Sequence, residues 1–499
     1  MSKYEYEGSE KKDIKKATAG GFVWSFGERF LAQLITALVT IILARILAPD
    51  DFGVVSIVTV FIVICNVFVT NGIGSALVQR KEVDDLDYNT ALCLNLGISF
   101  FIYILLFLVA PFIAGFYRME ILAPVIRVMG IRIPIAAINS VQQAYIRRKM
   151  EFRKFFFATL GGSIVSGIVG VILAVSGAGV WAIVAQYLTN VCTDTVMLSL
   201  FIDWRPRLEF SAASGKRTFS YGSKLLFAEL IATLGNNLRV LLVGHSFGAS
   251  DLAFFDQGQK YPALLTTNAN TAINQVMLPV FSRKQDEIKE LKNMLRNSVV
   301  VGTAILGPML VGFMAIAPSF VSIVLTDKWL PCIPYLRIFC LYYLTRPLEA
   351  LCGEAIKGMG KTGWVLIKLI VVNVSSIIFL IISVFVMKST LFLAYTMLAN
   401  MTVSVILNWY FSSKYLGYTL LEEVCDFLTG IFPAVIMGVI VVLMNNLPFG
   451  RMPVFIIQIL TGVMVYILLS YFLNRKVFTM IISCIPKIGP KMKMKQVTK

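Results

Sequence analysis

The sequence has 499 residues, which is enough for about three soluble domains of ordinary size. However, 57% of the residues are hydrophobic, only 15% are charged and the mean hydropathy is +0.78, which excludes a soluble globular protein. Apolar stretches recur from Phe22 to Leu473, and each can cross a hydrocarbon core about 30 Å thick. The composition therefore predicts an all-α, polytopic membrane protein.

The 45 Lys and Arg residues outnumber the 28 Asp and Glu residues, and the formal net charge is +17. In a soluble chain this excess would indicate a nucleic-acid partner, but in a membrane protein it indicates the orientation of the loops, so no nucleic acid is expected. The eight cysteines contain no C-x-x-C pair. The sequence therefore predicts no disulfide framework, no metal site and no cofactor.

Apolar runs bounded by polar residues, glycine and proline predict about fourteen transmembrane helices in chain order. The first six cover 21–47, 52–72, 89–115, 121–145, 153–175 and 180–202. The next six cover 218–243, 252–280, 296–325, 332–356, 363–386 and 391–412. The last two cover 424–445 and 452–473.

The distribution of positive charge predicts which connections face the cytoplasm. If the N-terminus is cytoplasmic, the outer connections hold only Arg118, Lys328, Lys388 and Arg451, and most other Lys and Arg residues lie in the inner connections and the two tails. Both termini are therefore expected in the cytoplasm. The outer connections are also short, which leaves no room for an extracytoplasmic domain and weighs against an enzyme with catalytic residues.

Three short matches in the same order indicate an internal repeat. The matching segments are Ser25–Leu31 with Ser220–Leu226, Ala48–Gly53 with Gly248–Ala253, and Pro124–Arg127 with Pro334–Arg337. They predict two pseudo-symmetric six-helix bundles in the same orientation, with a cavity between them, which is the arrangement of many transporters that alternate access.

The repeat divides the chain into six parts. We expect a cytoplasmic tail (1–20), an N-terminal six-helix bundle (21–202), a cytoplasmic linker (203–217), a C-terminal six-helix bundle (218–412), two appended helices (424–473) and a basic cytoplasmic tail (474–499).

Several segments resemble one superfamily of membrane transporters. They are the Trp24–Gly27 segment, the turn Leu43-Ala-Arg-Ile-Leu-Ala-Pro-Asp-Asp-Phe-Gly53, the Asn71–Arg80 segment, Arg127 and the basic region Arg147–Lys154. With these features the chain resembles the multidrug/oligosaccharidyl-lipid/polysaccharide exporter superfamily, and within it the polysaccharide transporter branch of Wzx-type flippases. The resemblance covers about residues 15–475.

This resemblance implies a flippase that moves an undecaprenyl-diphosphate-linked oligosaccharide across the bacterial plasma membrane by alternating access. The expected role is in surface polysaccharide synthesis, such as O-antigen, capsule, exopolysaccharide or teichuronic-type polymers. The implied partners are the lipid-linked oligosaccharide, membrane lipids, and the polymerase and chain-length machinery.

Charged residues inside the predicted helices are the candidate site residues. A central Lys or Arg costs about 2.5–3.5 kcal/mol on insertion scales, so ten of them cannot all face lipid. Those near helix ends can extend to an interface, and we assign Arg45, Arg239, Arg337 and Lys368 to this group. The acids within the helices are Glu28, Asp194, Glu229, Asp256, Glu349 and Glu354, and the other cations are Arg29, Arg127, Arg132, Lys224, Lys260 and Arg346.

Helical periodicity selects the residues that can line a cavity. Arg29 and Gln33 share one polar face of the first helix. On the eighth helix Asp256, Lys260, Asn270 and Asn274 share a face, and on the seventh Glu229 lies on a polar stripe. Because a diphosphate needs cations in a low-dielectric cavity, Arg29 and Lys260 are the first candidates for substrate binding, followed by Arg132 and Arg346.

Alternatives stay open for the accompanying groups. Arg346 can form an i,i+3 pair with Glu349, and Asp256 can pair with Lys260 at i,i+4. Asp256 and Asp194 can instead take part in coupling to protons or sodium. Two other functions are also considered: a drug or cation exporter of the same superfamily, which predicts an acidic N-terminal cavity, and a membrane glycan polymerase or ligase, which predicts a large outer loop.

Overall fold

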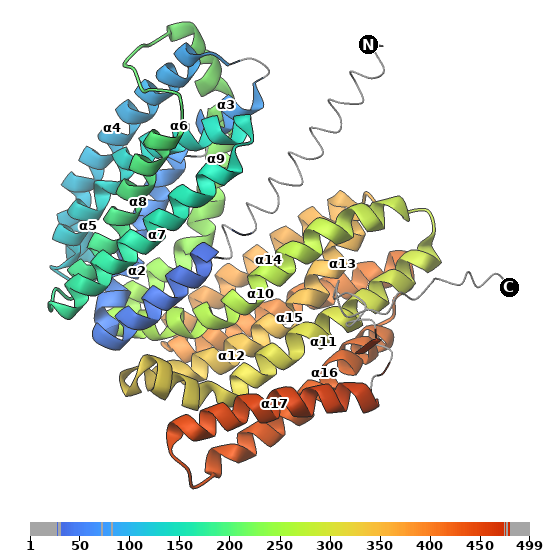
Figure 1. Cartoon of the computed structure of the whole chain (residues 1–499). Helices are drawn as coiled ribbons and strands as arrows, with labels where there is room; N and C mark the ends of the chain where they lie inside the picture. Colours follow the sequence, from blue (N-terminus) through green and yellow to red (C-terminus); the bar gives the residue numbers. More distant parts are fainter. Residues whose placement is uncertain are drawn as a thin grey trace. The chain divides into compact units, whose positions relative to one another are not determined.

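The computed structural model describes residue 27, residues 31–70, 73–80 and 83–473, and residues 475, 478 and 479. Within these residues the regular structure is entirely helical, and it divides into two compact units, residues 1–253 and 254–499 (Figure 1). The prediction of an all-α fold is confirmed. The assignment of the helices to two six-helix bundles stays a prediction.

The first unit begins with a helix over Leu31–Ile46. It continues with α2 (Pro49–Thr70), α3 (Ile73–Gln79), α4 (Asp85–Tyr117), α5 (Leu122–Gly130), α6 (Arg132–Lys149), α7 (Phe152–Val175), α8 (Val180–Phe201), α9 (Ala212–Phe247) and the start of α10 (Ala249–Arg283). Helix α9 begins inside the segment 203–217 that was predicted as a linker, and there the Ser211 side chain accepts a hydrogen bond from the Ser214 amide.

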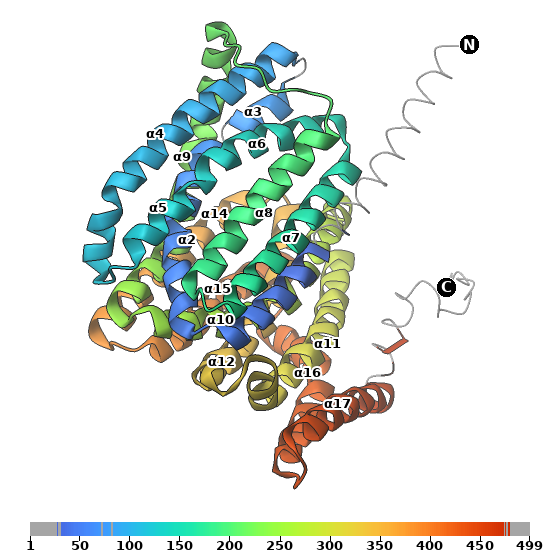
Figure 2. The ribbon, with the colours of Figure 1, turned by 60° about the vertical axis from the view of Figure 1, so that its left-hand side comes forward.

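The second unit holds most of α10, then α11 (Ile288–Phe320), which continues as a π-helical turn (Val321–Leu325), and a short 3₁₀ helix (Asp327–Cys332). It continues with α12 (Ile333–Leu344), α13 (Arg346–Gly358), α14 (Thr362–Ile381) with a second π-helical turn (Ile382–Val386), α15 (Thr390–Leu416), α16 (Leu420–Leu443) and α17 (Arg451–Leu473). In this unit α11 packs against α16, and α16 packs against α17 (Figure 2).

The fourteen predicted helices all have counterparts in the described part of the chain, but only nine are long and apolar enough to cross a membrane by hydropathy alone. The stretches outside this set are the first helix, α8, α9, α10 and the α12/α13 pair. The described part of the first helix, Leu31–Ile46, is apolar but shorter than a membrane span. The others carry polar or charged residues within the helix, for example Asp194 in α8 and Lys260 in α10, which are costly to expose to lipid.

Two of the predicted helices are each broken into two segments. The fourth is interrupted between α5 and α6 at Ile131, and the tenth between α12 and α13 at Thr345. A proline follows each break, Pro134 or Pro347, and proline lacks an amide hydrogen and clashes with the carbonyl four residues before it. Each second segment begins with an arginine, Arg132 in α6 and Arg346 in α13.

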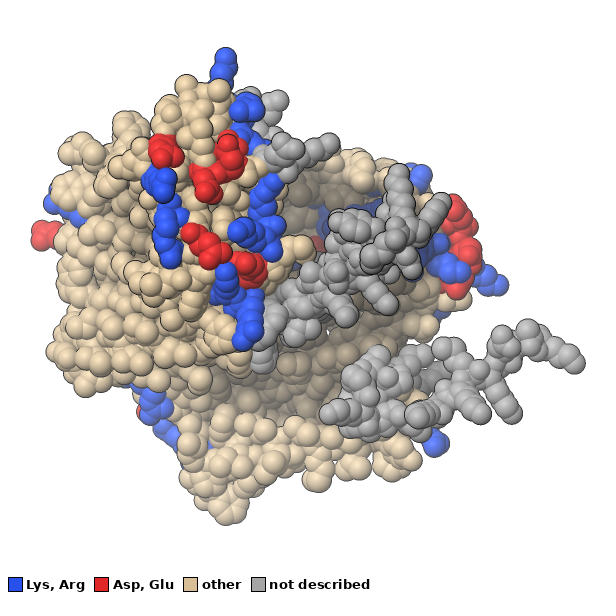
Figure 3. Space-filling model, turned by 45° about the horizontal axis from the view of Figure 1, so that its top comes forward, with Lys and Arg blue, Asp and Glu red and all other residues tan. Residues whose placement is uncertain are grey.

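Polar clamps join the connections at one end of the first unit. Arg80 donates to Asp87 Oδ1 (2.9 Å) and to the Ser214 carbonyl (3.1 Å), which ties the start of α9 to α4. Arg148 of α6 donates to the Leu77 carbonyl of α3 (3.2 Å). Charged side chains gather at this end in the space-filling view, whereas the flank below it is largely uncharged (Figure 3).

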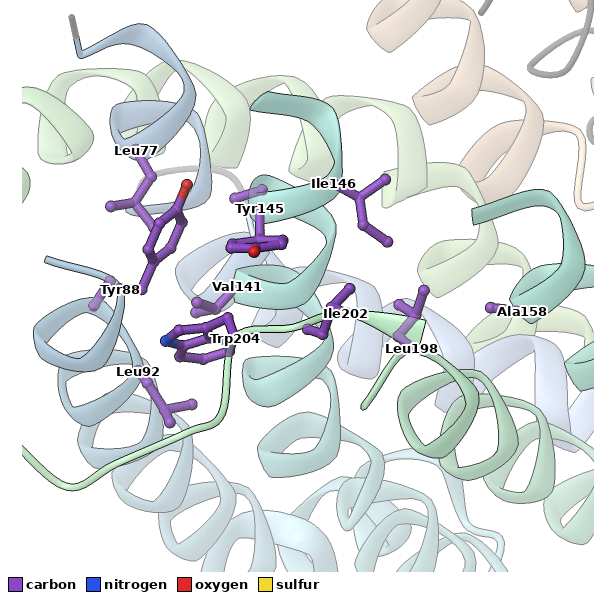
Figure 4. Close-up of a cluster of buried hydrophobic side chains, with 12 residues drawn as sticks. Leu77, Tyr88, Leu92, Val141, Tyr145, Ile146, Ala158, Leu198, Ile202 and Trp204 are labelled. Carbon is purple, nitrogen blue, oxygen red and sulfur yellow. The ribbon is translucent and has the colours of Figure 1, made fainter. Parts of the chain in front are cut away.

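An aromatic cluster fills the interior behind these clamps (Figure 4). Trp204, in the connection after α8, packs against Tyr88 of α4 at 5.9 Å between ring centroids, and Tyr88 packs against Tyr145 of α6 at 5.4 Å. Leu77 and Leu198 are also buried in this cluster. The clamps and the cluster together fix the ends of α3, α4, α6 and α8.

The connections between the other helix ends meet at the opposite end of the first unit. Tyr117 donates to the Leu241 carbonyl (3.1 Å), His245 stacks on Phe116 at 4.1 Å between centroids, and Ser250 donates to Asp50. Alternate connections therefore lie at alternate ends, as expected for helices that cross a membrane in turn.

Gly53 of α2 provides a test of the packing at this second end. A Cβ on Gly53 would lie 1.9 Å from the Ala249 carbonyl oxygen, so the backbone of α2 or α10 must move to accept a side chain. We expect Gly53→Ala to lower the free energy of unfolding by about 1–3 kcal/mol, measured by thermal unfolding of the purified protein.

The matched control is Gly97→Ala, because a Cβ on this helical glycine would meet nothing within 4 Å. Alanine is the better helix former by about 0.5–1 kcal/mol, so Gly97→Ala should leave stability unchanged or raise it slightly. Equal unfolding temperatures for the two variants would contradict the close approach of α2 to α10.

Candidate functional site

The first unit contains a polar cavity of about 530 Å³, which we call the Arg132 cavity. It is lined by residues of α2, α3, α6 and α8. Its polar lining residues are Asn66, Thr70, Gln79, Arg132, Asn139, Ser140, Gln143, Arg147, Asn190 and Asp194. The guanidinium of Arg132 lies over the Tyr187 ring, 5.4 Å from its centroid, and its buried Nε has no hydrogen-bond partner among the described residues.

A chain of hydrogen bonds runs through this cavity along α6. Asn139 donates to Asp194 Oδ2 (2.9 Å), Gln143 donates to Asn139 (2.6 Å) and Arg147 donates to Gln143 (3.1 Å). The three donors are four residues apart and therefore share one face of the helix. They connect the carboxylate of Asp194 to the charged end of the unit. The other carboxylate oxygen of Asp194 is buried without a hydrogen-bond partner in the described part of the chain.

The second unit contains a cavity of about 420 Å³, which we call the Glu349 cavity. It is lined by residues of α10, α13, α14 and α15, among them the cations Arg346, Lys357 and Lys368. Glu349 accepts from Arg346 (2.9 Å), Lys368 (2.9 Å) and Ser404 (3.1 Å). One carboxylate thus serves two cations, so this group carries an excess of one positive charge.

The two cavities have a common plan within their own units. Each is lined by the arginine that begins the segment after a helix break, Arg132 or Arg346. Each arginine also lies over a tyrosine ring, and the Arg346–Tyr342 distance is 5.1 Å to the centroid. Because the prolines terminate the preceding helical segment, they place an arginine at a break inside each cavity wall.

The other candidate residues are distributed as follows. Arg29 lies outside the described residues, and nothing is described of the Asn274 side chain within α10. Gln33 is half-buried, Glu229 is exposed, and Asn270 lines the Glu349 cavity. Asp256 and Lys260 are half-buried on α10, and the carboxylate of Asp256 acts electrostatically on the ammonium of Lys260.

One sequence-based expectation is wrong, and another is confirmed. Lys368 was assigned to an interface at a helix end, but its side chain is only 17% exposed and pairs with Glu349 inside the second unit. The Glu349 carboxylate belongs to another helix, α13, and it holds the Lys368 ammonium at 2.9 Å inside the unit. The i,i+3 pair of Arg346 with Glu349 is present at 2.9 Å.

Several neutral amides of these cavities were not among the candidate residues predicted from the sequence. Asn139 and Gln143 belong to the Arg132 cavity, and Asn408 donates to the Glu349 carbonyl (3.1 Å) in the other. The spacing Asn139, Gln143, Arg147 on one helical face was the available signal. Among the described residues, no group of three or more His, Cys, Asp or Glu side chains could hold a metal ion.

Comparisons with known proteins give one family match and several relatives. The model of a family described as "Polysaccharide biosynthesis protein" matches residues 42–334. The chain is 26% identical to the lipopolysaccharide biosynthesis protein WzxC of Escherichia coli (strain K12), over 70% of this chain and 71% of that protein. It is 23% identical to the teichuronic acid biosynthesis protein TuaB of Bacillus subtilis (strain 168), over 60% of this chain and 62% of that protein.

A third relative is the succinoglycan biosynthesis transport protein ExoT of Rhizobium meliloti (strain 1021), which is 24% identical over 66% of this chain and 67% of that protein. Among solved structures, the lipid II flippase MurJ in an inward closed conformation matches with a TM-score of 0.70 and 15% identity, over 91% of this chain and 98% of that chain. An inward-facing multidrug resistance transporter of the MATE family gives a TM-score of 0.55 and 16% identity, over 81% and 94%. At these identities the structural matches indicate a shared fold.

Proposed function

The chain belongs to the polysaccharide biosynthesis protein family, and on this premise we propose that it is a flippase for a lipid-linked oligosaccharide in the bacterial inner membrane. The cargo in this proposal is an oligosaccharide on a polyprenyl diphosphate, moved from the inner to the outer leaflet for surface polysaccharide synthesis. The names of its relatives, which include a biosynthesis transport protein, support this assignment. The protein is a transporter and has no catalytic role.

The observation that carries the proposal is the pair of cavities that bring cations into membrane-crossing helices. Arg132 and Arg346 each line a polar cavity. A charged side chain within a membrane-spanning stretch costs free energy of insertion, and such residues usually have a function. A diphosphate or an acidic sugar is an anion, and charge-assisted hydrogen bonds to it are about twice as strong as neutral ones. Arg29 and Lys260 are proposed to contact the same anionic head. Gln33, Asp194, Glu229, Asp256, Asn270 and Asn274 are proposed to complete the polar lining.

Transport in this proposal follows from a change in the arrangement of two six-helix bundles, 21–202 and 218–412. A substrate shifts such an equilibrium only through its different affinity for the two arrangements. The protein must therefore bind the diphosphate-sugar head group more tightly in the arrangement that is open to the cytoplasm, or an ion gradient must drive the cycle. Asp194 and Asp256 are the carboxylates proposed for ion coupling.

The proposed orientation has both termini in the cytoplasm. It is supported by the connections within each unit, because those with most Lys and Arg meet at one end. In the second unit, Lys292 and Arg296 lie at that end, and Arg451 pairs with Asp327 at the other. Polymerase and chain-length machinery that acts at the outer face of the membrane would then receive the product.

The polyprenyl chain requires an apolar path, and one groove of the second unit supports a position for it. This groove, about 430 Å³, lies between α10, α11, α16 and α17. Most of its lining is apolar, for example Met309, Phe313, Ile459 and Val463. In this proposal the tail follows the appended helices of 424–473, while the head enters the polar cavity.

The rival drug-exporter function predicts an acidic cavity in the N-terminal half of the chain. The Arg132 cavity of the first unit is instead lined by two cations, Arg132 and Arg147, and by a single acid, Asp194. In the Glu349 cavity each carboxylate is paired, Glu349 with two cations and Glu354 with Lys357 (2.7 Å). Such a cavity repels a cationic drug and attracts an anion. The structural likeness to a multidrug transporter therefore concerns the fold.

Reconstitution into liposomes tests the proposal. A fluorescent polyprenyl-diphosphate oligosaccharide on the inner leaflet should reach the outer leaflet faster with the protein than in protein-free vesicles, with proton and sodium gradients imposed in turn. A cationic dye such as ethidium serves as the competing cargo and should not be moved. Transport of ethidium without transfer of the lipid would refute the flippase function and support the drug-exporter function.

A further inference from the structure

The Glu349 cavity combines three features that together fit one class of ligand. It holds an excess of positive charge, buried amide oxygens without partners, and an aromatic wall. We infer that it binds a sugar residue that carries an anionic group, and that this group competes with the carboxylate of Glu349 for Arg346 and Lys368. The inference rests on the proposed function and adds to it a site for an anionic sugar, whose negative charge belongs either to the glycan or to the phosphate at its diphosphate end.

The charge in this cavity is arranged around one carboxylate. Glu349 and Lys368 are 18% and 17% exposed, and Arg346 is 35% exposed, so the group is mostly shielded from water. Two cations share one anion, whereas the neighbouring Lys357 and Glu354 balance each other. A second anion that enters can pair with the cation that Glu349 releases, and in a partly buried site such contacts are stronger than in water.

Two amide side chains offer acceptors for hydroxyl groups. The side-chain oxygens of Asn270 and Asn408 are buried and have no hydrogen-bond partner within the described residues. The Asn408 amide nitrogen is held by the Glu349 carbonyl at 3.1 Å, which fixes the direction of its oxygen. Buried polar atoms in proteins are nearly always hydrogen-bonded, so these two oxygens point to an absent donor. Sugar hydroxyls are such donors.

An aromatic wall completes the cavity. Trp364 of α14 packs on Phe411 of α15 at 4.5 Å between centroids, and both rings line the cavity. The indole nitrogen of Trp364 donates to the Tyr415 hydroxyl, which fixes the ring. Rigid rings provide apolar contact area with little loss of entropy, and they suit the C–H face of a sugar ring. The volume of about 420 Å³ lies within the range of small-molecule sites.

Competition with Glu349 and a purely structural ion pair predict opposite changes in the affinity for an anionic sugar when the charge of Glu349 is removed. If Glu349 occupies the cations until the ligand arrives, removal of its charge must strengthen binding of an anionic sugar. If Glu349 only supports the fold, Glu349→Gln must weaken binding or leave it unchanged. Glutamine keeps the size of the side chain and the hydrogen bond from Ser404, so the change is chiefly one of charge.

The experiment uses the full chain in nanodiscs of zwitterionic lipid and measures binding by ligand-observed NMR. The probes are glucuronic acid and glucose 1-phosphate, which place the anion on the sugar or on its phosphate, and neutral glucose. We expect at least one anionic probe to bind about ten times more tightly than glucose, and Glu349→Gln to strengthen that binding about tenfold. The probe that binds identifies whether the glycan or the diphosphate end supplies the anion.

Further variants keep the test decisive if Glu349→Gln does not fold. Asn270→Ala and Lys368→Ala should each lower the affinity for the anionic probe about tenfold. Trp364→Phe should lower this affinity less than Trp364→Ala does. The matched control is Lys284→Ala, which removes a lysine paired at 2.9 Å with Glu287 outside the cavity, and it should bind as the unchanged protein does. Equal binding of all three probes, or weaker binding by Glu349→Gln, overturns the inference.

The liposome assay separates this inference from the proposed function. Normal transfer of the lipid-linked oligosaccharide by Asn270→Ala and Trp364→Ala, with no binding of anionic sugars, refutes the sugar site and leaves the flippase intact. Binding of anionic sugars by a protein that transfers no lipid supports the site and refutes the flippase.

Discussion

Liposomes that contain the Lys260→Ala variant are expected to transfer the lipid-linked oligosaccharide at least about ten times more slowly than those with the unchanged protein. Lys260 is half-buried on α10, on the helical face that also holds Asp256. A hydrogen bond to a charged group contributes about 1.5–3 kcal/mol, which corresponds to about 10–100-fold in rate if the contact forms only in the step that limits transport. The measurement is the initial rate of leaflet transfer at matched protein content.

A double variant distinguishes contact with substrate from a structural pair. If Lys260 serves only to neutralise Asp256, the double variant Asp256→Asn with Lys260→Ala should transfer as fast as Asp256→Asn alone, because no unpaired carboxylate remains. If Lys260 contacts the diphosphate, the double variant should be at least about ten times slower than Asp256→Asn alone. Lys289→Ala, which removes an exposed lysine at the end of the same unit, is the control and should transfer normally. Normal transfer by Lys260→Ala itself would remove this residue from the site.

The Arg296→Ala substitution should produce the largest loss of stability, about 3 kcal/mol. Arg296 of α11 donates to both carboxylate oxygens of Asp426 in α16, at 2.7 and 3.0 Å, and to Glu422 at 3.3 Å. Asp426 is 12% exposed and also accepts from the Tyr418 hydroxyl at 3.0 Å. Removal of the arginine leaves this carboxylate shielded from water without its cation, which costs about 3–5 kcal/mol for a buried pair and falls at the lower end here because Arg296 is 35% exposed.

Thermal unfolding with a thiol-reactive dye measures this loss, since buried Cys352 lies in the same cluster as Tyr418. The matched control is Arg451→Ala, which removes an arginine that also reaches both oxygens of its partner, Asp327, at 2.9 and 3.2 Å. These side chains are 69% and 60% exposed, so the pair contributes about 0–1 kcal/mol. A similar shift for both variants would mean that burial does not control the strength of the Arg296 clamp.

The series of helices could be predicted from the sequence because a membrane helix needs a long apolar run, and such runs are visible in one dimension. Pairs within one helix were equally accessible, since Arg346 and Glu349 lie three residues apart and the structure pairs them. Lys368 was misassigned because its partner Glu349 lies on another helix, and no spacing rule connects them. Which cation extends to the surface and which turns inward depends on packing between helices.

The cavities themselves were less predictable. Their positions depend on the breaks at Ile131 and Thr345, which follow from Pro134 and Pro347, whereas the apolar runs predicted an unbroken helix for each stretch. The neutral amides Asn139 and Asn408 carry no charge, and they lie outside the first, seventh and eighth helices, on which polar faces were identified from the sequence. Their roles become visible only when their hydrogen-bond partners are known.

The two broken helices also have a consequence for how the chain is synthesised. Segment α5 has nine residues and spans only about 14 Å, less than half of the hydrocarbon thickness, so it cannot be inserted without α6. The stretch Leu122–Lys149 is the least hydrophobic of the nine candidate spans in the described part of the chain, and the α12/α13 stretch is outside that set. Both stretches must therefore be retained at the translocon by neighbouring helices of their own unit. These neighbours are α4 and α8 for the α5/α6 stretch, and α11 and α15 for the α12/α13 stretch. Nascent chains truncated before α8 or before α15 should leave these arginine-containing stretches accessible to water.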